Sequence, residues 1–161
     1  MSLDERRDSC TVWYMNTAAN IDINASAGRV WAVFSDVQQW PTWTSSVTSV
    51  EALDGPELVV GHRFRIKQPW LPPLVWQITS VDAPRGWTWT VRSLGATTTA
   101  SHDVEPRGAG SCLVTQVIEQ RGALGVVAGA LTRRLTRRYL ALEGAGLKTQ
   151  SENEIRHAAQ P

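Results

Sequence analysis

The chain is 161 residues long, which fits one domain that buries roughly two-thirds of its unfolded surface. Its formal net charge of +1 gives no global field that would attract a nucleic acid or an anionic membrane. The longest apolar stretch, residues 123–131, contains two glycines and is much shorter than the about 20 residues of a membrane-spanning helix. The N-terminus lacks the apolar segment of a signal peptide.

The cysteine and tryptophan contents bear on the compartment and the interior. Cys10 and Cys112 form no C-x-x-C pair and no spacing with histidine that suits a metal. We therefore expect reduced thiols, a cytoplasmic location, and no metal or cofactor. Eight tryptophans stand against two phenylalanines and two tyrosines. Because tryptophan is large and carries an N–H group, this bias indicates a wide, aromatic-lined interior rather than a tight aliphatic core.

The first expected elements are a strand and a short aromatic helix. Residues 1–10 are charged, and we expect them to be disordered. Alternation of apolar and polar residues at 21–23 predicts a strand. Residues 26–36 carry an aromatic and apolar stripe at helical spacing, with Ser26 as the N-cap. The Trp-Pro-Thr-Trp sequence at 40–43 predicts a second, broken helical turn.

Six more strands are expected before the C-terminal region, because turn residues separate short apolar or alternating runs. These strands are 47–53, 62–67, 74–81, 87–94, 97–105 and 112–120. The proline-rich segment 68–73 must be a loop, since proline cannot donate to a sheet ladder. Seven strands with short connections indicate an antiparallel meander.

The last expected element is a long helix, because the apolar period becomes helical after residue 123. Its expected inner stripe is Leu124, Ala128, Leu131, Leu135, Tyr139 and Leu142. Its outer face carries Arg133, Arg134, Arg137 and Arg138. We interpret this arginine face as solvated, with an acidic or phosphate-rich partner as the minority alternative. Gly144 and Gly146 weaken the helix end. We therefore expect one domain over residues 11–149 and a polar tail over 150–161.

A short aromatic helix, an aspartate at its end, a Trp-Pro-x-Trp step and then strands resemble the opening of the START-like polyketide cyclase/dehydrase superfamily. The segment is Ser26–Trp43, and the resemblance covers about residues 17–149. It implies an α+β helix-grip fold, in which a curved seven-stranded antiparallel sheet, two short helices and a long C-terminal helix enclose a ligand cavity. Many members carry a pocket-facing histidine followed by an apolar residue and proline, as His102, Val104 and Pro106 stand here.

Turn positions in the meander predict which strand residues face one another. With regular turns we expect Ile78 opposite Trp89, Trp89 opposite His102, and His102 opposite Thr115. Side chains alternate across a sheet, so these residues should share its concave face. A single β-bulge would exchange the faces of the residues that follow it.

Small residues on the expected concave face leave volume unfilled under the long helix, which predicts an apolar cavity with polar groups near its mouth. The expected ligand-binding residues are Trp43, Phe64, Trp76, Trp89, Val91, Thr98, Ala100, His102, Thr115, Val117, Glu119, Leu131 and Leu135. His102 is the only candidate for catalysis. The alternative is structural, because a histidine on an apolar face is more often a hydrogen-bonded interior residue. Thr115 then serves as its partner, and Glu119 ends a strand in solvent.

These observations favour a protein that binds or transports a small hydrophobic molecule, aromatic or polycyclic and lipid- or polyketide-like. The resemblance also implies an enzyme of the polyketide aromatase/cyclase kind, in which His102 transfers protons during cyclisation and dehydration. Binding is preferred because only one inward group titrates near neutrality. A weaker alternative is a partner-regulating protein of the chaperone-activator or coenzyme-Q-binding kind. We expect no nucleic-acid partner, and a homodimer is compatible with the sequence.

Overall fold

The computed structural model describes residues 14–93 and 95–158, with side chains described as far as residue 153. The strands are β1 (Tyr14–Ile23), β2 (Ser49–Ala52), β3 (Arg63–Lys67), β4 (Leu74–Asp82), β5 (Gly86–Ser93), β6 (Ala96–Gly108) and β7 (Ser111–Arg121). The helices are α1 (Ala27–Ser35), the single 3-10 turn η1 (Val37–Gln39), α2 (Trp40–Trp43) and α3 (Ala123–Ala158).

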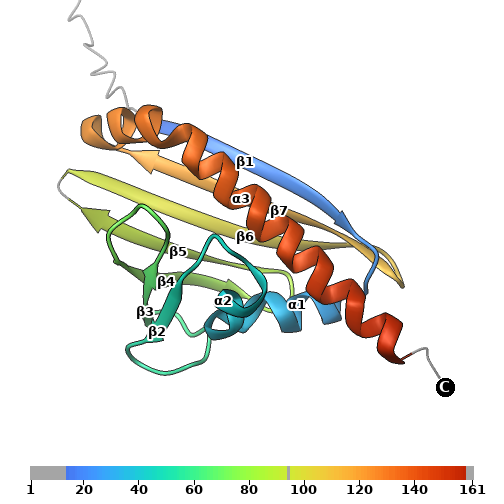
Figure 1. The fold of residues 1–161 in the computed structure, drawn as a ribbon. Coiled ribbons are helices and arrows are strands. Elements are labelled where there is room, and N and C mark those ends of the chain that lie inside the picture. The colour runs from blue at the N-terminus through green and yellow to red at the C-terminus, as the bar shows by residue number, and fades with distance from the viewer. Residues whose placement is uncertain (1–13, 94, 159–161) are drawn as a thin grey trace, which may run out of the picture.

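The seven strands form one antiparallel sheet in the order β1-β7-β6-β5-β4-β3-β2. The sheet is curved, and α3 runs diagonally across its concave side, while α1 and α2 lie under the C-terminal half of α3 (Figure 1). The expected seven-stranded sheet, two short helices and long C-terminal helix are therefore confirmed.

Side-chain hydrogen bonds hold the short helices in place. The Ser26 hydroxyl accepts a hydrogen bond from the backbone N–H of Arg29 at 3.3 Å, so the expected N-cap of α1 is present. The indole Nε1 of Trp40 donates to the carbonyl of Phe34 at 2.9 Å. This bond holds the start of α2 against the end of α1, and it directs both rings into the core.

Helix α3 continues to Ala158, so the polar segment that begins at residue 150 is helical as far as this residue. Gly144 and Gly146 do not end the helix; they allow it to approach its neighbours closely. A Cβ at position 146 would lie 2.2 Å from the carbonyl oxygen of Trp43, and one at position 144 would contact Ile21 at 3.5 Å. The glycines therefore serve packing, which outweighs their low helix propensity.

Two of the three expected strand pairings need correction. Ile78 lies opposite Trp89, as expected. Trp89, however, pairs with Ala100, and His102 pairs with Trp87. Ser93 pairs with Ala96, so the β5–β6 turn lies one residue earlier than expected. Such a change moves the register by two residues, and the side chains of β6 keep their expected face.

The pairing of β6 with β7 is displaced by one residue, and its effect is larger. His102 lies opposite Gln116 rather than Thr115. Between Pro106 and Gly108 the register advances by two residues on β6 and by one on β7. Proline has no N–H for the ladder, which favours a bulge at this place. A displacement by one residue exchanges the two faces of β7.

Within residues 14–93 and 95–158, none of the helices combines the length and the apolar character that crossing a membrane requires. In the same part of the chain, no group of three or more His, Cys, Asp or Glu side chains is placed to hold a metal ion. Cys112 is buried and unpaired, and Cys10 lies outside the described residues.

Candidate functional site

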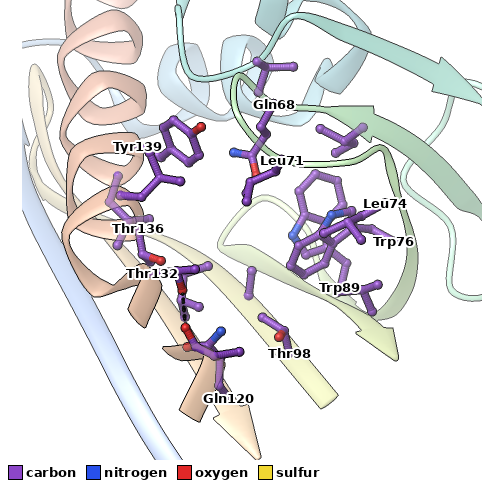
Figure 2. Close-up of a pocket in the computed structure, with 18 of the residues that line it drawn as sticks. Gln68, Leu71, Leu74, Trp76, Trp89, Thr98, Gln120, Thr132, Thr136 and Tyr139 are labelled. Atoms are coloured by element: carbon purple, nitrogen blue, oxygen red, sulfur yellow. Dashed lines mark hydrogen bonds between the residues drawn. The ribbon is translucent and has the colours of Figure 1, made fainter. Parts of the chain in front are cut away.

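A cavity of about 220 Å³ lies between α3 and the concave face of the sheet. Figure 2 shows Tyr139, Thr136 and Thr132 of α3 on one side, facing the 68–73 loop and the indoles of β4 and β5. Its apolar lining includes Trp40, Trp76, Trp89, Ile66, Leu74, Val91, Ala100, Ile118 and Leu135. Its polar lining includes Gln68, Ser93, Thr98, His102, Gln120, Thr132, Thr136, Tyr139 and Glu143. The lining is therefore mainly apolar, with polar groups at separate points.

The structure brings together about half of the residues expected at the site. Those that line the cavity are Trp76, Trp89, Val91, Thr98, Ala100, His102 and Leu135. Those that do not line it are Trp43, Phe64, Thr115, Val117, Glu119 and Leu131. The second group is explained by three different physical causes.

Three of the misplaced residues belong to β7. Because of the bulge in β6, Thr115, Val117 and Glu119 lie on the outer face of the sheet. Glu119 forms an ion pair there with Arg121. The inner face instead carries Gln116, Ile118 and Gln120, of which the last two line the cavity.

Leu131 does not line the cavity, although Ala128, Leu135 and Tyr139 of the expected stripe do. The Leu131 side chain is 82% exposed, and that of Leu124 is 57% exposed. At position 129 the helix lies close to the sheet, since a Cβ there would lie 2.2 Å from the Gln120 side-chain amide oxygen. The helix therefore presents Gly125, Thr132 and Thr136 to the cavity together with three members of the expected stripe, Ala128, Leu135 and Tyr139.

Phe64 and Trp43 belong to the core beside the cavity. Phe64 is fully buried, and its ring centroid lies 6.5 Å from that of Trp89. The ring centroid of Trp43 lies 5.6 Å from that of Trp40. Both residues thus pack against indoles that line the cavity without lining it themselves.

The proline-rich loop at 68–73 closes one side of the cavity and is fastened at two points. The Tyr139 hydroxyl donates a hydrogen bond to the Pro69 carbonyl, which joins α3 to the loop. The Lys67 ammonium donates to the Leu71 carbonyl. Gln68 and Leu71 consequently face Tyr139 across the cavity (Figure 2).

His102 lies at the aromatic end of the cavity. Its ring stacks on that of Trp87, with centroids 4.4 Å apart, and meets Phe34 edge-on at 5.3 Å. Trp40 and Trp89 lie within 5.8 Å of it. Burial lowers the pKa of His102 to about 3, although a hydrogen bond with the Trp87 backbone opposes this. The imidazole is therefore neutral at pH 7, and within the described residues its Nδ1 atom has no hydrogen-bond partner.

Glu143 of α3 is the other ionisable group of interest. Its side chain is buried, and one carboxyl oxygen accepts a hydrogen bond from the Ser46 hydroxyl at 3.1 Å. The other oxygen accepts one from the Gln116 amide at 2.9 Å. Thr44 extends this cluster, since its hydroxyl lies 2.9 Å from that of Ser46. Burial raises the pKa of Glu143 to about 7, and the bonds from Ser46 and Gln116 only partly offset this.

The sequence interpretation missed Glu143 and Gln116. Glu143 is the sole acidic residue between Ala123 and Ser151, and it follows Tyr139 by four positions. A single carboxylate, one helical turn from an expected inner residue, was the sequence feature that could have indicated a functional role for Glu143. Gln116 gave no comparable signal, since its face depends on the bulge in β6.

These residues give the cavity two chemically different polar groups. His102 is a neutral hydrogen-bonding group near pH 7, so it is not suited to transfer protons there. Glu143 changes its charge close to pH 7 and is suited to that task. The cavity therefore offers an apolar surface for a ligand, a neutral hydrogen-bonding group and a group that can exchange a proton.

Comparison with known proteins agrees with this architecture. The sequence profile of one family, described as polyketide cyclase/dehydrase and lipid transport, matches residues 15–152. No curated protein sequence matches the chain.

Several solved structures share the fold. Zhui aromatase/cyclase from Streptomyces sp. R1128 superposes with a TM-score of 0.76 at 14% identity, covering 92% of this chain and 100% of its own. Norcoclaurine synthase from Thalictrum flavum, in complex with dopamine and hydroxybenzaldehyde, gives 0.71 at 15% identity over 99% and 97%. A START superfamily protein from Mycobacterium smegmatis gives 0.69 at 15% identity over 86% and 97%. At these identities the likeness shows the fold alone.

Proposed function

Because the chain belongs to the polyketide cyclase/dehydrase and lipid transport family, we propose that its internal cavity binds a small hydrophobic molecule with one or two aromatic rings. The observation that carries this proposal is the cavity itself, which is mainly apolar and lined by three tryptophans. Such cavities with a few polar groups are the usual form of small-molecule sites.

The cavity volume limits the size of the ligand. An engineered protein cavity of about 150 Å³ accommodates benzene, and the cavity here has about 220 Å³. A bicyclic ring, or one ring with a short chain, suits this space better than a long lipid. Each 100 Å² of apolar ligand surface removed from water would contribute about 2.5 kcal/mol, which offsets part of the entropy cost of association.

Tryptophan fluorescence offers a direct binding assay, since Trp40, Trp76 and Trp89 line the cavity. We expect 2-naphthalenemethanol to change this fluorescence saturably, and nucleotides or simple sugars to leave it unchanged. Ala100→Phe should abolish the response, because Ala100 is 1% exposed and its side chain faces the cavity between Trp89 and Ile118.

The matched control is Ala18→Phe, which adds the same ring to an exposed position of β1. It should bind the probe like the parent protein. Thermal unfolding of both variants shows whether the fold survives. Binding by a folded Ala100→Phe variant as tight as that of the parent would exclude this cavity as the ligand site.

A second candidate function is catalysis of the polyketide cyclase kind, and Glu143 is the observation that favours it. A carboxyl group with a pKa of about 7 exists in both protonation states at neutral pH, as a general acid or base requires. In this role Glu143 would remove a proton from the carbon next to a ligand carbonyl and return it to the product. His102 would accept or donate a hydrogen bond without changing its charge.

Hydrogen–deuterium exchange tests this candidate without knowledge of the substrate. If Glu143 is a general base, the protein should accelerate exchange at the α-carbon of 4-phenyl-2-butanone in deuterated buffer at pH 7. Glu143→Gln should then lower the rate by roughly 10²- to 10⁴-fold, the typical contribution of such a group. If the parent protein does not accelerate the exchange, catalysis by Glu143 is rejected and ligand binding is the only function proposed.

A further inference from the structure

The charge of the cavity lining is unusual, because it is negative or zero and never positive near neutral pH. Among the described residues that line the cavity there is no Lys or Arg, and Glu143 is the only acidic one. His102 is neutral at pH 7 because burial lowers its pKa to about 3. A ligand carboxylate or phosphate would thus find no positive partner in this lining.

Within the described part of the chain, the hydrogen-bond partners of Glu143 also include no cation. Its two hydrogen-bond partners there, Ser46 and Gln116, are neutral donors. The ion pairs found in the described residues, such as those of Asp54 with Arg63 and Glu152 with Lys148, lie elsewhere. A buried carboxylate without a cation is energetically unfavourable, and a bound cation would offset that cost.

The aromatic part of the lining suits a cation as well. Trp40, Trp76 and Trp89 line the same cavity, and their indole faces attract ammonium groups at close range. An aromatic lining with one buried carboxylate therefore combines the two features that bind organic ammonium ions.

We infer that the cavity selects hydrophobic amines, binding the ring against the indoles of Trp76 and Trp89 and the ammonium group against the carboxylate of Glu143. This inference rests on the proposed ligand-binding function and narrows its ligand class. Neutral aromatic molecules of the same shape bind more weakly than the amines, and aromatic carboxylates bind more weakly still.

The groups around Glu143 define how this selection depends on pH. Of the other titratable side chains in the lining, His102 of β6 is neutral, and Tyr139 of α3 has a pKa raised by burial. Gln116 of β7 and the residues Thr44 and Ser46 after α2 do not titrate. On the same helix, Arg138 is exposed and Lys148 is paired with Glu152. Glu143 is therefore the group whose ionisation accompanies amine binding.

Three probes that share one ring system test the inference: 2-naphthylmethylamine, 2-naphthalenemethanol and 2-naphthoate. At pH 8 the parent protein should bind the amine about tenfold or more tightly than the alcohol, since hydrogen bonds to charged groups are stronger than neutral ones. The carboxylate should bind more weakly than the alcohol. Glu143→Gln should reduce the amine-to-alcohol affinity ratio to about one, whereas the control Glu119→Gln, on the outer face of β7, should leave the ratio as in the parent.

Calorimetry of the parent protein tests the inference independently of any variant. With a pKa of about 7, Glu143 is about 90% protonated at pH 6, so amine binding there should release about 0.9 proton. Comparison of two buffers with different ionisation enthalpies measures this release. The alcohol should release none.

The outcomes separate this inference from the function on which it rests. Two results would overturn the amine selection and leave the cavity function intact. In the first, the alcohol binds and the amine binds with equal or weaker affinity. In the second, the amine binds without releasing a proton. Failure of all three probes to bind would overturn the cavity function, and the amine selection with it.

Discussion

Replacing Glu143 with glutamine should remove a pH dependence of folding stability that this one carboxyl group creates. Its pKa is about 7 in the folded protein against an ordinary value of 4.5. Each pKa unit corresponds to about 1.36 kcal/mol, so ionisation of Glu143 destabilises the folded state by roughly 3 kcal/mol. The side chain is 6% exposed, so solvent does little to reduce this effect.

The sign follows from proton binding. Between pH 4.5 and pH 7 the folded state holds the proton on Glu143 while the unfolded state has lost it, so stability decreases as pH rises. The unfavourable contribution of Glu143 to folding stability has its full size above the pKa of about 7 in the folded state and is absent below the ordinary pKa of 4.5. Between pH 5 and pH 8 it changes by roughly 2.5 kcal/mol.

Urea denaturation of the parent and of Glu143→Gln at pH 5, 6, 7 and 8 measures this effect. The stability of the variant relative to the parent should rise by roughly 2.5 kcal/mol from pH 5 to pH 8. Glu119→Gln corrects for the general effect of losing one carboxyl group. A relative stability that is the same at all four pH values would refute the reasoning, because the carboxyl would then be equally easy to ionise in both states.

Two further perturbations have expected outcomes. The parent protein should lose stability between pH 7 and pH 4.5, because its His102 imidazole is protonated there only in the unfolded state; His102→Gln should reduce this loss by roughly 2.5 kcal/mol in acid denaturation. An equal loss of stability in parent and variant would contradict the low pKa of His102. Gly146→Ala should lower stability by roughly 1–3 kcal/mol in urea, since its Cβ would meet the Trp43 carbonyl at 2.2 Å, whereas Gly144→Ala should raise it by roughly 0.5–1 kcal/mol. Equal effects of both alanines would contradict the packing argument.

Most of the fold could be predicted from the sequence because each strand and helix has a local signal. Apolar alternation, turn residues and the Ser26 cap mark the elements, and the Trp-Pro-Thr-Trp step marks α2. The expected pairing of Ile78 with Trp89 is present, although a register shift between Ile78 and Ser80 separates it from the β4–β5 turn. These features depend on residues near one another in the chain.

The errors arose where distant parts of the chain meet. Which residues of α3 face inward depends on its packing against the sheet, and the helix lies close to the sheet at Gly129. Leu131 is exposed although Leu135 of the same stripe lines the cavity, so hydrophobicity alone did not identify which stripe residues face inward. Gly146 was expected to weaken the helix end, but it lies inside a helix that continues to Ala158, where it packs against Trp43.

The bulge in β6 connects the geometry of a distant hairpin to the chemistry of the cavity. With a regular β6–β7 register, Thr115 would face inward and Gln116 would face outward. The one-residue displacement near Pro106 places the Gln116 amide against Glu143 instead. That amide is one of the two donors that oppose the rise in the pKa of Glu143, the other being Ser46. Without it the carboxyl would be still harder to ionise at neutral pH, so the bulge helps to keep Glu143 able to exchange a proton or pair with a cation there.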